Sequence, residues 1–241
     1  MLKTTLSNWE ATARRNRSLF LLIAFLFLLV AAPVLAPVFN LRLLFDLFMT
    51  LIFAVSIYSA SVKRWHYMIS TVFFVVTVPA IWVEYIFPGR AAYLISQANG
   101  VLFLLFVGLR TTINLIRTKK ITANTIFAAI VVYLVAGVLW SGIYSMLEIV
   151  HPDSFNLGGI DVRAAAYRML YFSFVTLTTL GYGDIAPHTD VASAFVILEA
   201  IFGQMYITVL IAWLVGRYIS ESDGRPSGDP APPEMRDEAH G

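Results

Sequence analysis

Residues 176–184 read Thr-Leu-Thr-Thr-Leu-Gly-Tyr-Gly-Asp and lie between two long apolar segments of the chain. Gly181 and Gly183 alternate with bulkier residues, and glycine adopts a positive φ without steric cost. The backbone from Thr179 to Gly183 can therefore turn successive carbonyls the same way. Non-helical backbone at membrane depth is stable only where protein buries it or where it lines a water-filled path. The stretch therefore predicts an ion pathway.

Residues 179–184 (TLGYGD) resemble the selectivity filter of tetrameric potassium channels, in the pore-loop, voltage-gated-like superfamily, where valine is usual at the position of Leu180. The resemblance implies that four chains contribute one filter strand each, and that protein oxygens replace the water shell of K⁺. It assigns K⁺ binding to Thr179, Leu180, Gly181 and Tyr182, with Gly183 completing the filter. Because the Leu180 side chain points behind the filter in this family, we expect selectivity to survive the change.

The same resemblance assigns support of the filter to Tyr171, Phe172, Val175, Thr178 and Asp184. Tyr171 and Phe172 occupy the positions of the family's aromatic pair, and Tyr182 is expected to pack against aromatics of the pore helix. Val175 stands where some relatives have a glutamate that bonds the filter aspartate. We therefore expect Tyr171 either to bond Asp184 or to leave it facing water.

A competing motif is the glycine fingerprint of dinucleotide-binding folds, which Gly181-x-Gly183-x-x-Ala186 also fits. That fingerprint needs a preceding strand, a helix opening directly at its end and an acidic residue about 20 positions further on. Here Pro187 follows, and Glu199 comes too early. The context excludes this interpretation.

The composition is that of an integral membrane protein. Hydrophobic residues make up 59% of the 241 residues and charged residues 13%, and the mean hydropathy is +0.75. The chain has no cysteine and four histidines in no metal-binding cluster, so no catalytic site is visible. We expect no enzyme, no cofactor and no nucleic-acid partner, with K⁺ as the permeant ion and membrane lipid around the protein.

The apolar runs predict an all-α membrane protein with six transmembrane helices plus a re-entrant pore helix and a selectivity-filter loop, forming a tetrameric pore. The six runs are 19–39, 43–62, 67–87, 91–110, 124–148 and 190–218. Each is long enough to cross about 30 Å of hydrocarbon at about 1.5 Å per residue. A helix over 163–178 is too short for a comfortable crossing and fits a pore helix that leads into the filter.

These runs divide the chain into five predicted parts. They are a cytoplasmic N-terminal segment (1–18), a four-helix sensor-like domain (19–110), an interfacial linker (111–123), a pore domain (124–219) and a disordered cytoplasmic tail (220–241). A cleaved signal peptide is the alternative for the first run, with a small-residue site at Val34-Leu35-Ala36. Pro37 at the cleavage junction argues against it.

Basic residues test the topology. On the proposed cytoplasmic side lie Lys3, Arg14, Arg15, Arg17, Lys63, Arg64, Arg117, Lys119, Lys120 and Arg217; outside lie Arg42, Arg90, Arg163 and Arg168. This distribution follows the positive-inside rule. It predicts a multi-pass protein of the plasma membrane with both termini cytoplasmic and the filter on the outer face.

Three positions of the transmembrane runs carry further hypotheses. Gly203 lies where the family has a hinge glycine, although close helix packing through a small residue is the alternative. Glu199 and Gln204 are polar within an apolar helix and are candidates for function. Glu199 faces either the pore helix or a subunit contact.

The predicted function is a homotetrameric, potassium-selective channel that conducts passively and is weakly or not voltage-gated. Residues 91–109 contain no Lys or Arg, so the voltage sensor is degenerate and Arg110 is the one residual sensing charge. A poorly selective cation channel and a potassium transporter subunit are the alternatives. The gating stimulus stays open.

Overall fold

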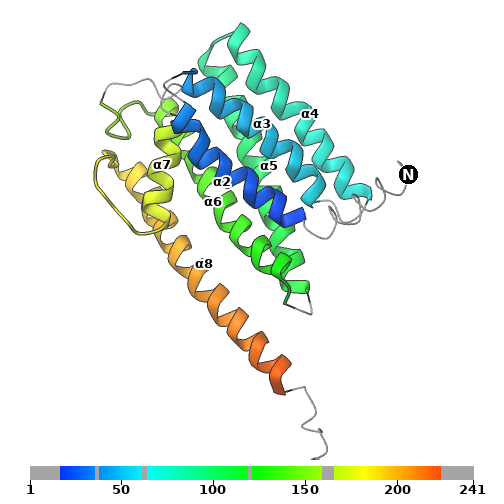
Figure 1. The fold of residues 1–241 in the computed structure, drawn as a ribbon. Coiled ribbons are helices and arrows are strands. Elements are labelled where there is room, and N and C mark those ends of the chain that lie inside the picture. Colours follow the sequence, from blue (N-terminus) through cyan, green and yellow to red (C-terminus); the bar gives the residue numbers. More distant parts are fainter. Residues whose placement is uncertain (1–16, 36–37, 61–63, 119–120, 159–165, 224–241) are drawn as a thin grey trace, which may run out of the picture.

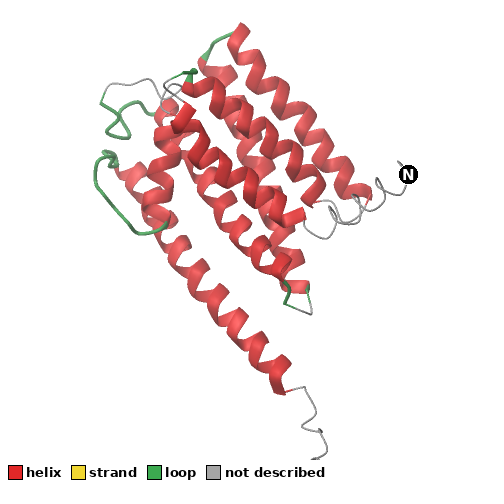
Figure 2. Cartoon of the chain, viewed as in Figure 1, coloured by secondary structure: helices red, strands yellow, loops and turns green. Residues whose placement is uncertain are grey.

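The fold is an assembly of long helices, and the computed structural model describes residues 17–35, 38–60, 64–118, 121–158 and 166–223 (Figure 1). The helices are α2 (Arg17–Leu35), α3 (Leu41–Ala60), α4 (Arg64–Ile86), α5 (Arg90–Arg117), α6 (Ala123–Val150), α7 (Ala166–Leu177) and α8 (Asp190–Asp223). The described residues contain no strand, only an isolated bridge between Phe155 and Pro187 (Figure 2). Helices suit an apolar chain because they satisfy their backbone polar groups internally.

Five of the described helices are long and apolar enough to cross a membrane. These spans are Ser18–Leu35, Met68–Ile86, Arg90–Arg117, Ala123–Val150 and Asp190–Arg217. They confirm a multi-pass, all-α membrane protein. The helix α3 packs against α2 and α4 but is not among the five, so the count of six crossings remains a prediction.

Several predicted boundaries shift. The fourth run was predicted to end near Arg110, but α5 continues without a break to Arg117. The next helix, α6, begins with a capping box in which Thr122 and Thr125 bond each other's backbone N–H groups. The helix α7, which the sequence predicts as the pore helix, ends at Leu177, one residue before its predicted end. The predicted segment 1–18 lies almost wholly outside the described residues, and so does the tail beyond Asp223.

A proline inside α2 shows how this helix is joined to α7. Pro33 has no N–H, so the carbonyl of Leu29, four residues earlier, loses its helical donor. The hydroxyl of Tyr167 on α7 donates to that carbonyl at 3.2 Å. The freed backbone group of α2 therefore becomes an attachment point for the pore helix.

Of the first four described helices, α2 and α5 pack on α6 and α3 packs on α7, while α4 packs on α3 and α5. Their shared core with α6 and α7 includes Phe25, Ile52, Phe103, Val131 and Leu170. The stretch of α6 that could cross a membrane is 56% buried within the chain. The corresponding stretch of α8 is 11% buried, and α8 extends away from the bundle (Figure 1). Because α8 is this exposed, most of its apolar surface is free for neighbours outside this chain.

Candidate functional site

The predicted filter is the loop that joins α7 to α8, and its backbone alternates in handedness. Thr179, Gly181 and Gly183 have φ of +59°, +56° and +78°. The two glycines adopt the positive φ expected from the sequence. Thr179 was not foreseen there, because a β-branched residue rarely adopts a positive φ and no pattern in the sequence marks it.

Two successive amide groups of this loop point at one acceptor. The carbonyl of Val175 accepts from the backbone N–H of Leu180 at 2.9 Å and from that of Gly181 at 3.2 Å. In a trans peptide the N–H of one residue is antiparallel to the carbonyl of the residue before it. The carbonyls of Thr179 and Leu180 therefore both turn away from the pore helix. Successive carbonyls on one side are the arrangement that a strand of cation-binding oxygens needs.

The loop is open to its surroundings in a single chain. Residues 178–184 are all exposed, and Ile185 is the first buried residue after them. The side chains of Leu180 and Tyr182 are 54% and 66% exposed. The expected packing of Tyr182 against pore-helix aromatics is therefore not made within one chain, because this chain leaves the ring largely uncovered.

The two expected aromatic supports lie in different surroundings. Phe172 is buried, and its ring centroid lies 5.3 Å from that of Tyr144 and 5.4 Å from that of Phe155. Tyr171 is half-buried, and its hydroxyl lies close enough to the Asp184 carboxylate to interact with it. This interaction favours the bonded one of the two expected arrangements.

The outer end of the filter is held by backbone pairing. The loop after α6 runs beside the segment that follows the filter, with His188 N–H donating to Ser154 O at 2.8 Å and Asn156 N–H to Ala186 O at 3.0 Å. Glu148, at the end of α6, accepts from two N–H groups of the same loop. The outer loop thereby fixes the exit of the filter to α6.

The inner end of the filter meets α6 and α8. The carbonyl of Leu177 accepts from the Tyr133 hydroxyl at 2.9 Å, and the backbone of Gly203 packs directly on the same carbonyl. Gln204 Nε2 donates to Thr179 Oγ1 at 3.3 Å. Gln204, which the sequence marked as a candidate for function, therefore lies against the first residue of the predicted K⁺ site.

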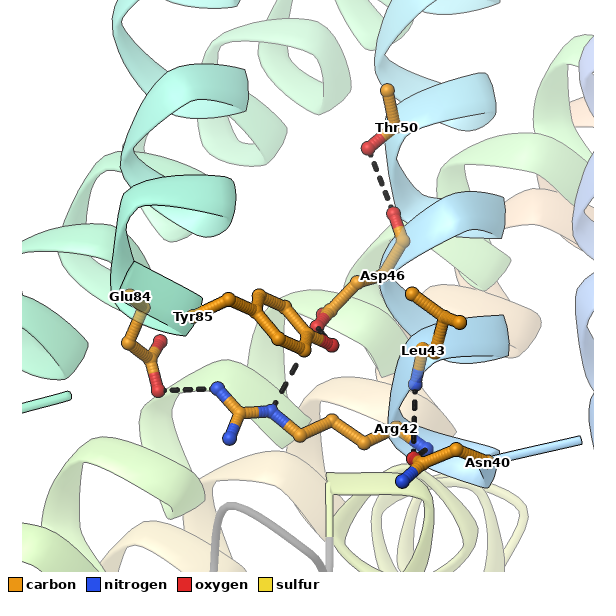
Figure 3. Close-up of polar contacts among 7 residues, drawn as sticks. All are labelled: Asn40, Arg42, Leu43, Asp46, Thr50, Glu84 and Tyr85. Carbon is orange, nitrogen blue, oxygen red and sulfur yellow. Dashed lines mark hydrogen bonds and ion pairs between the residues drawn. The ribbon is translucent and has the colours of Figure 1, made fainter. Parts of the chain in front are cut away.

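A polar cluster outside the predicted filter lies between α3 and α4 (Figure 3). Arg42 at the start of α3 bonds Glu84 of α4 at 2.5 Å, and its Nε lies 3.9 Å from Asp46. The Tyr85 hydroxyl donates to Asp46 at 2.7 Å. The cluster borders a cavity of about 60 Å³ that also touches α5 and α6. Arg42 and Glu84 are 42 residues apart, so no spacing in the sequence indicates that they pair.

The basic residues of α5 do not meet these acids. Arg90 donates to the Val150 carbonyl at the outer end, and the half-buried Arg110 has no described hydrogen-bond partner for its Nε. Among the described residues, no group of three or more His, Cys, Asp or Glu side chains is placed to hold a metal ion.

The comparisons with known proteins indicate ion channels. The model of a family described as "Ion channel" matches residues 121–220, which hold α6, α7, the filter and most of α8. The chain is 35% identical over 98 residues to "Two-pore potassium channel 5" of Arabidopsis thaliana, covering 41% of this chain and 21% of that protein. It is 34% identical over 89 residues to "Two pore potassium channel c" of Oryza sativa subsp. japonica, covering 37% and 18%.

The chain therefore spans about a fifth of the length of the curated relatives it matches. No solved structure gives a significant match. The matched family and the relatives are ion channels and not enzymes, and the relatives are named as potassium channels. The residues that the family model matches include the predicted filter loop.

Proposed function

We propose that this chain is one subunit of a homotetrameric potassium channel that conducts K⁺ passively through the filter TLGYG. The single observation that carries the proposal is the pair of N–H groups, from Leu180 and Gly181, on the Val175 carbonyl. It turns the preceding carbonyls to one open side, as dehydrated K⁺ requires. Thr179, Leu180, Gly181 and Tyr182 supply the oxygens in this proposal.

The tetramer is proposed because one strand cannot surround an ion. The exposed Leu180 and Tyr182 side chains need apolar neighbours, and so does the outer surface of α8. The exposed apolar residues of α8 include Ile197, Leu198, Ile201, Phe202, Met205, Val209, Ile211 and Val215. Three further copies would cover the filter side chains and leave one face of α8 to line the pore.

The six-crossing arrangement, the plasma membrane and the cytoplasmic termini are part of the same proposal. Five helices are long and apolar enough to cross a membrane by themselves. The sixth crossing and the orientation of the chain therefore rest on the placement of the basic residues. The sixth crossing would be α3, which packs between α2 and α4 and pairs its charges with α4 instead of exposing them.

Weak or absent voltage dependence follows from the charges of α5. At most Arg110 crosses the field in each subunit, which for four subunits is worth about 9 kcal/mol per 100 mV, against the tens that steep gating requires. Asp46 and Glu84 are already paired with Arg42, which lies on α3 together with Asp46 and reaches Glu84 on α4. The first four helices then serve as an anchoring domain.

The test is recording from purified full-length protein in planar bilayers, with different K⁺ and Na⁺ concentrations on the two sides. A reversal potential near the K⁺ equilibrium value, from particles of four-chain mass on a native gel, is the expected result. A reversal potential midway between the two ions would indicate a poorly selective cation channel. A one-chain mass with K⁺ uptake would indicate a transporter subunit. A conductance that rises steeply with voltage would contradict the proposed role of Arg110.

A further inference from the structure

A buried carboxyl group lies where three helices of the pore module meet, outside the filter itself. Glu199 of α8 is fully buried. Its Oε2 accepts a hydrogen bond from the Tyr144 hydroxyl of α6, and its Oε1 lies 2.5 Å from Ser173 Oγ on α7. The sequence left open whether Glu199 faces the pore helix or another subunit, and the structure places it against the pore helix of its own chain.

The number of available protons decides the charge of this carboxyl group. Ser173 Oγ lies 2.5 Å from Glu199 Oε1 and also 2.7 Å from the carbonyl oxygen of Gly137. A carbonyl only accepts, and a serine hydroxyl has one proton to donate. If Ser173 donates to Gly137, the short contact with Glu199 needs a proton on the carboxyl. An ionised Glu199 would leave one of the two oxygen pairs without a proton between them.

The surroundings offer nothing to balance a negative charge. The ion pairs found in the described part of the chain lie around Arg42, and neither involves Glu199. The titratable side chains that face Glu199 are Tyr144 and Tyr133 of α6, while α7 presents only the Ser173 hydroxyl. An isolated buried carboxylate is costly, whereas a neutral acid with every hydrogen bond made is not.

The contact is close to the groups that shape the filter. Ser173 precedes by two residues Val175, whose carbonyl holds the N–H groups of Leu180 and Gly181. One helical turn after Glu199, Gly203 packs on the carbonyl of Leu177. A movement of α8 at Glu199 therefore passes through α7 to the backbone of the filter.

We propose that Glu199 is held as a neutral carboxylic acid and is a positioning residue that ties α8 to the pore helix and so sets the geometry of the filter. The proposal rests on the potassium-channel function for its effect on current. Ionisation of Glu199 would break one of its short contacts and loosen the filter from α8.

Two substitutions distinguish the effect of the proton on Glu199 from the effect of having a side chain of this size at the position. Glu199→Gln keeps the shape and the hydrogen bonds of the neutral acid, since its amide donates to Ser173 and its carbonyl accepts from Tyr144. Glu199→Ala removes both bonds. In bilayers, we expect the decay of current under sustained opening in Glu199→Gln to match the wild type at neutral pH. We expect decay to be about tenfold faster in Glu199→Ala, which corresponds to about 1.4 kcal/mol.

The pH dependence of current decay is a further test, because it would not differ between wild type and Glu199→Gln if the role of Glu199 were purely structural. Wild-type current should decay faster as the bath becomes alkaline, whereas Glu199→Gln should not respond. A Glu199→Gln current that decays as fast as that of Glu199→Ala would overturn the proposal. The same pH profile of current decay in wild type and Glu199→Gln would also overturn it.

An infrared measurement keeps the proposal testable without current. The difference spectrum between wild type and Glu199→Gln should contain the carbonyl-stretch band of a protonated carboxylic acid. A carboxylate band in its place would overturn the neutral acid even if Glu199→Ala fails to fold. A wild type that shows the acid band but conducts no K⁺ would refute the proposed function and leave the protonation state of Glu199 standing.

Discussion

Gly203 is the residue at which the structure offers a measurable choice between a hinge and a packing contact. A Cβ added there would lie 2.2 Å from the carbonyl oxygen of Leu177 and 3.1 Å from its carbon. Contacts between carbon and oxygen are normally about 3.3 Å or longer, so α8 would have to move about 1 Å from the pore helix. The obstacle is backbone, which cannot rotate aside as a side chain can.

The expected cost of Gly203→Ala follows from these contacts. Overpacking costs about 1–3 kcal/mol, and the better helix propensity of alanine offsets about 1 kcal/mol of it. With a backbone obstacle we expect a net loss of about 2 kcal/mol per chain, which lowers Tm by about 4–8 °C. Gly216→Ala is the matched control, because it lies on the same helix with nothing within 4 Å of its added Cβ.

The assay is thermal denaturation of the detergent-solubilised protein, followed by bilayer recording of both variants. Gly203→Ala should melt below wild type, and Gly216→Ala should melt at or above it. Equal melting temperatures for the two variants would refute the packing argument. If Gly203→Ala kept its stability and lost only open time, the hinge hypothesis would be the better explanation.

Two further predictions concern the filter. Gly181→Ala should abolish selective conduction, because an alanine at φ +56° costs about 1–2 kcal/mol in each chain. The control is Gly158→Ala, at φ +63° in the outer loop with equally open space, which should still conduct selectively. A Gly181→Ala channel that stays selective would contradict the filter assignment. Tyr171→Phe should speed the decay of current under sustained opening, because it removes the hydroxyl that interacts with Asp184; unchanged decay would show that this interaction does not support the filter.

The sequence was sufficient to predict that the chain forms long apolar helices and that the filter glycines adopt a positive φ, because both depend on local chemistry. Apolar run length determines a crossing, and a positive φ favours glycine. It was not sufficient for the partners of Glu199, since an inner helix that is apolar nearly all round has no periodicity to indicate which face meets which neighbour. The bond from Tyr167 to Leu29 was equally hidden: the sequence shows that Pro33 frees a carbonyl but not which side chain reaches it.

Three contacts of α8 with its own chain lie on one face in its first half, and they predict where the helix can move. Glu199, Gly203 and Tyr206 are spaced by four and three residues, and the Tyr206 hydroxyl donates to the Ala129 carbonyl at 2.6 Å. If the gate opens by movement of the second half of α8, the Tyr206 bond is the last one that resists it.

Tyr206→Phe should therefore raise the open fraction in single-channel recordings by about fivefold, for about 1 kcal/mol lost with one hydrogen bond. Tyr133→Phe is the control: its ring lies 5.7 Å from that of Tyr206, but its hydroxyl bonds Leu177 and not α8. An open fraction that is unchanged in Tyr206→Phe, or that rises equally in both variants, would place the moving segment of α8 elsewhere. A rise confined to Tyr206→Phe would mean that α8 pivots on the anchored face and that its contact with the pore helix persists while the gate moves.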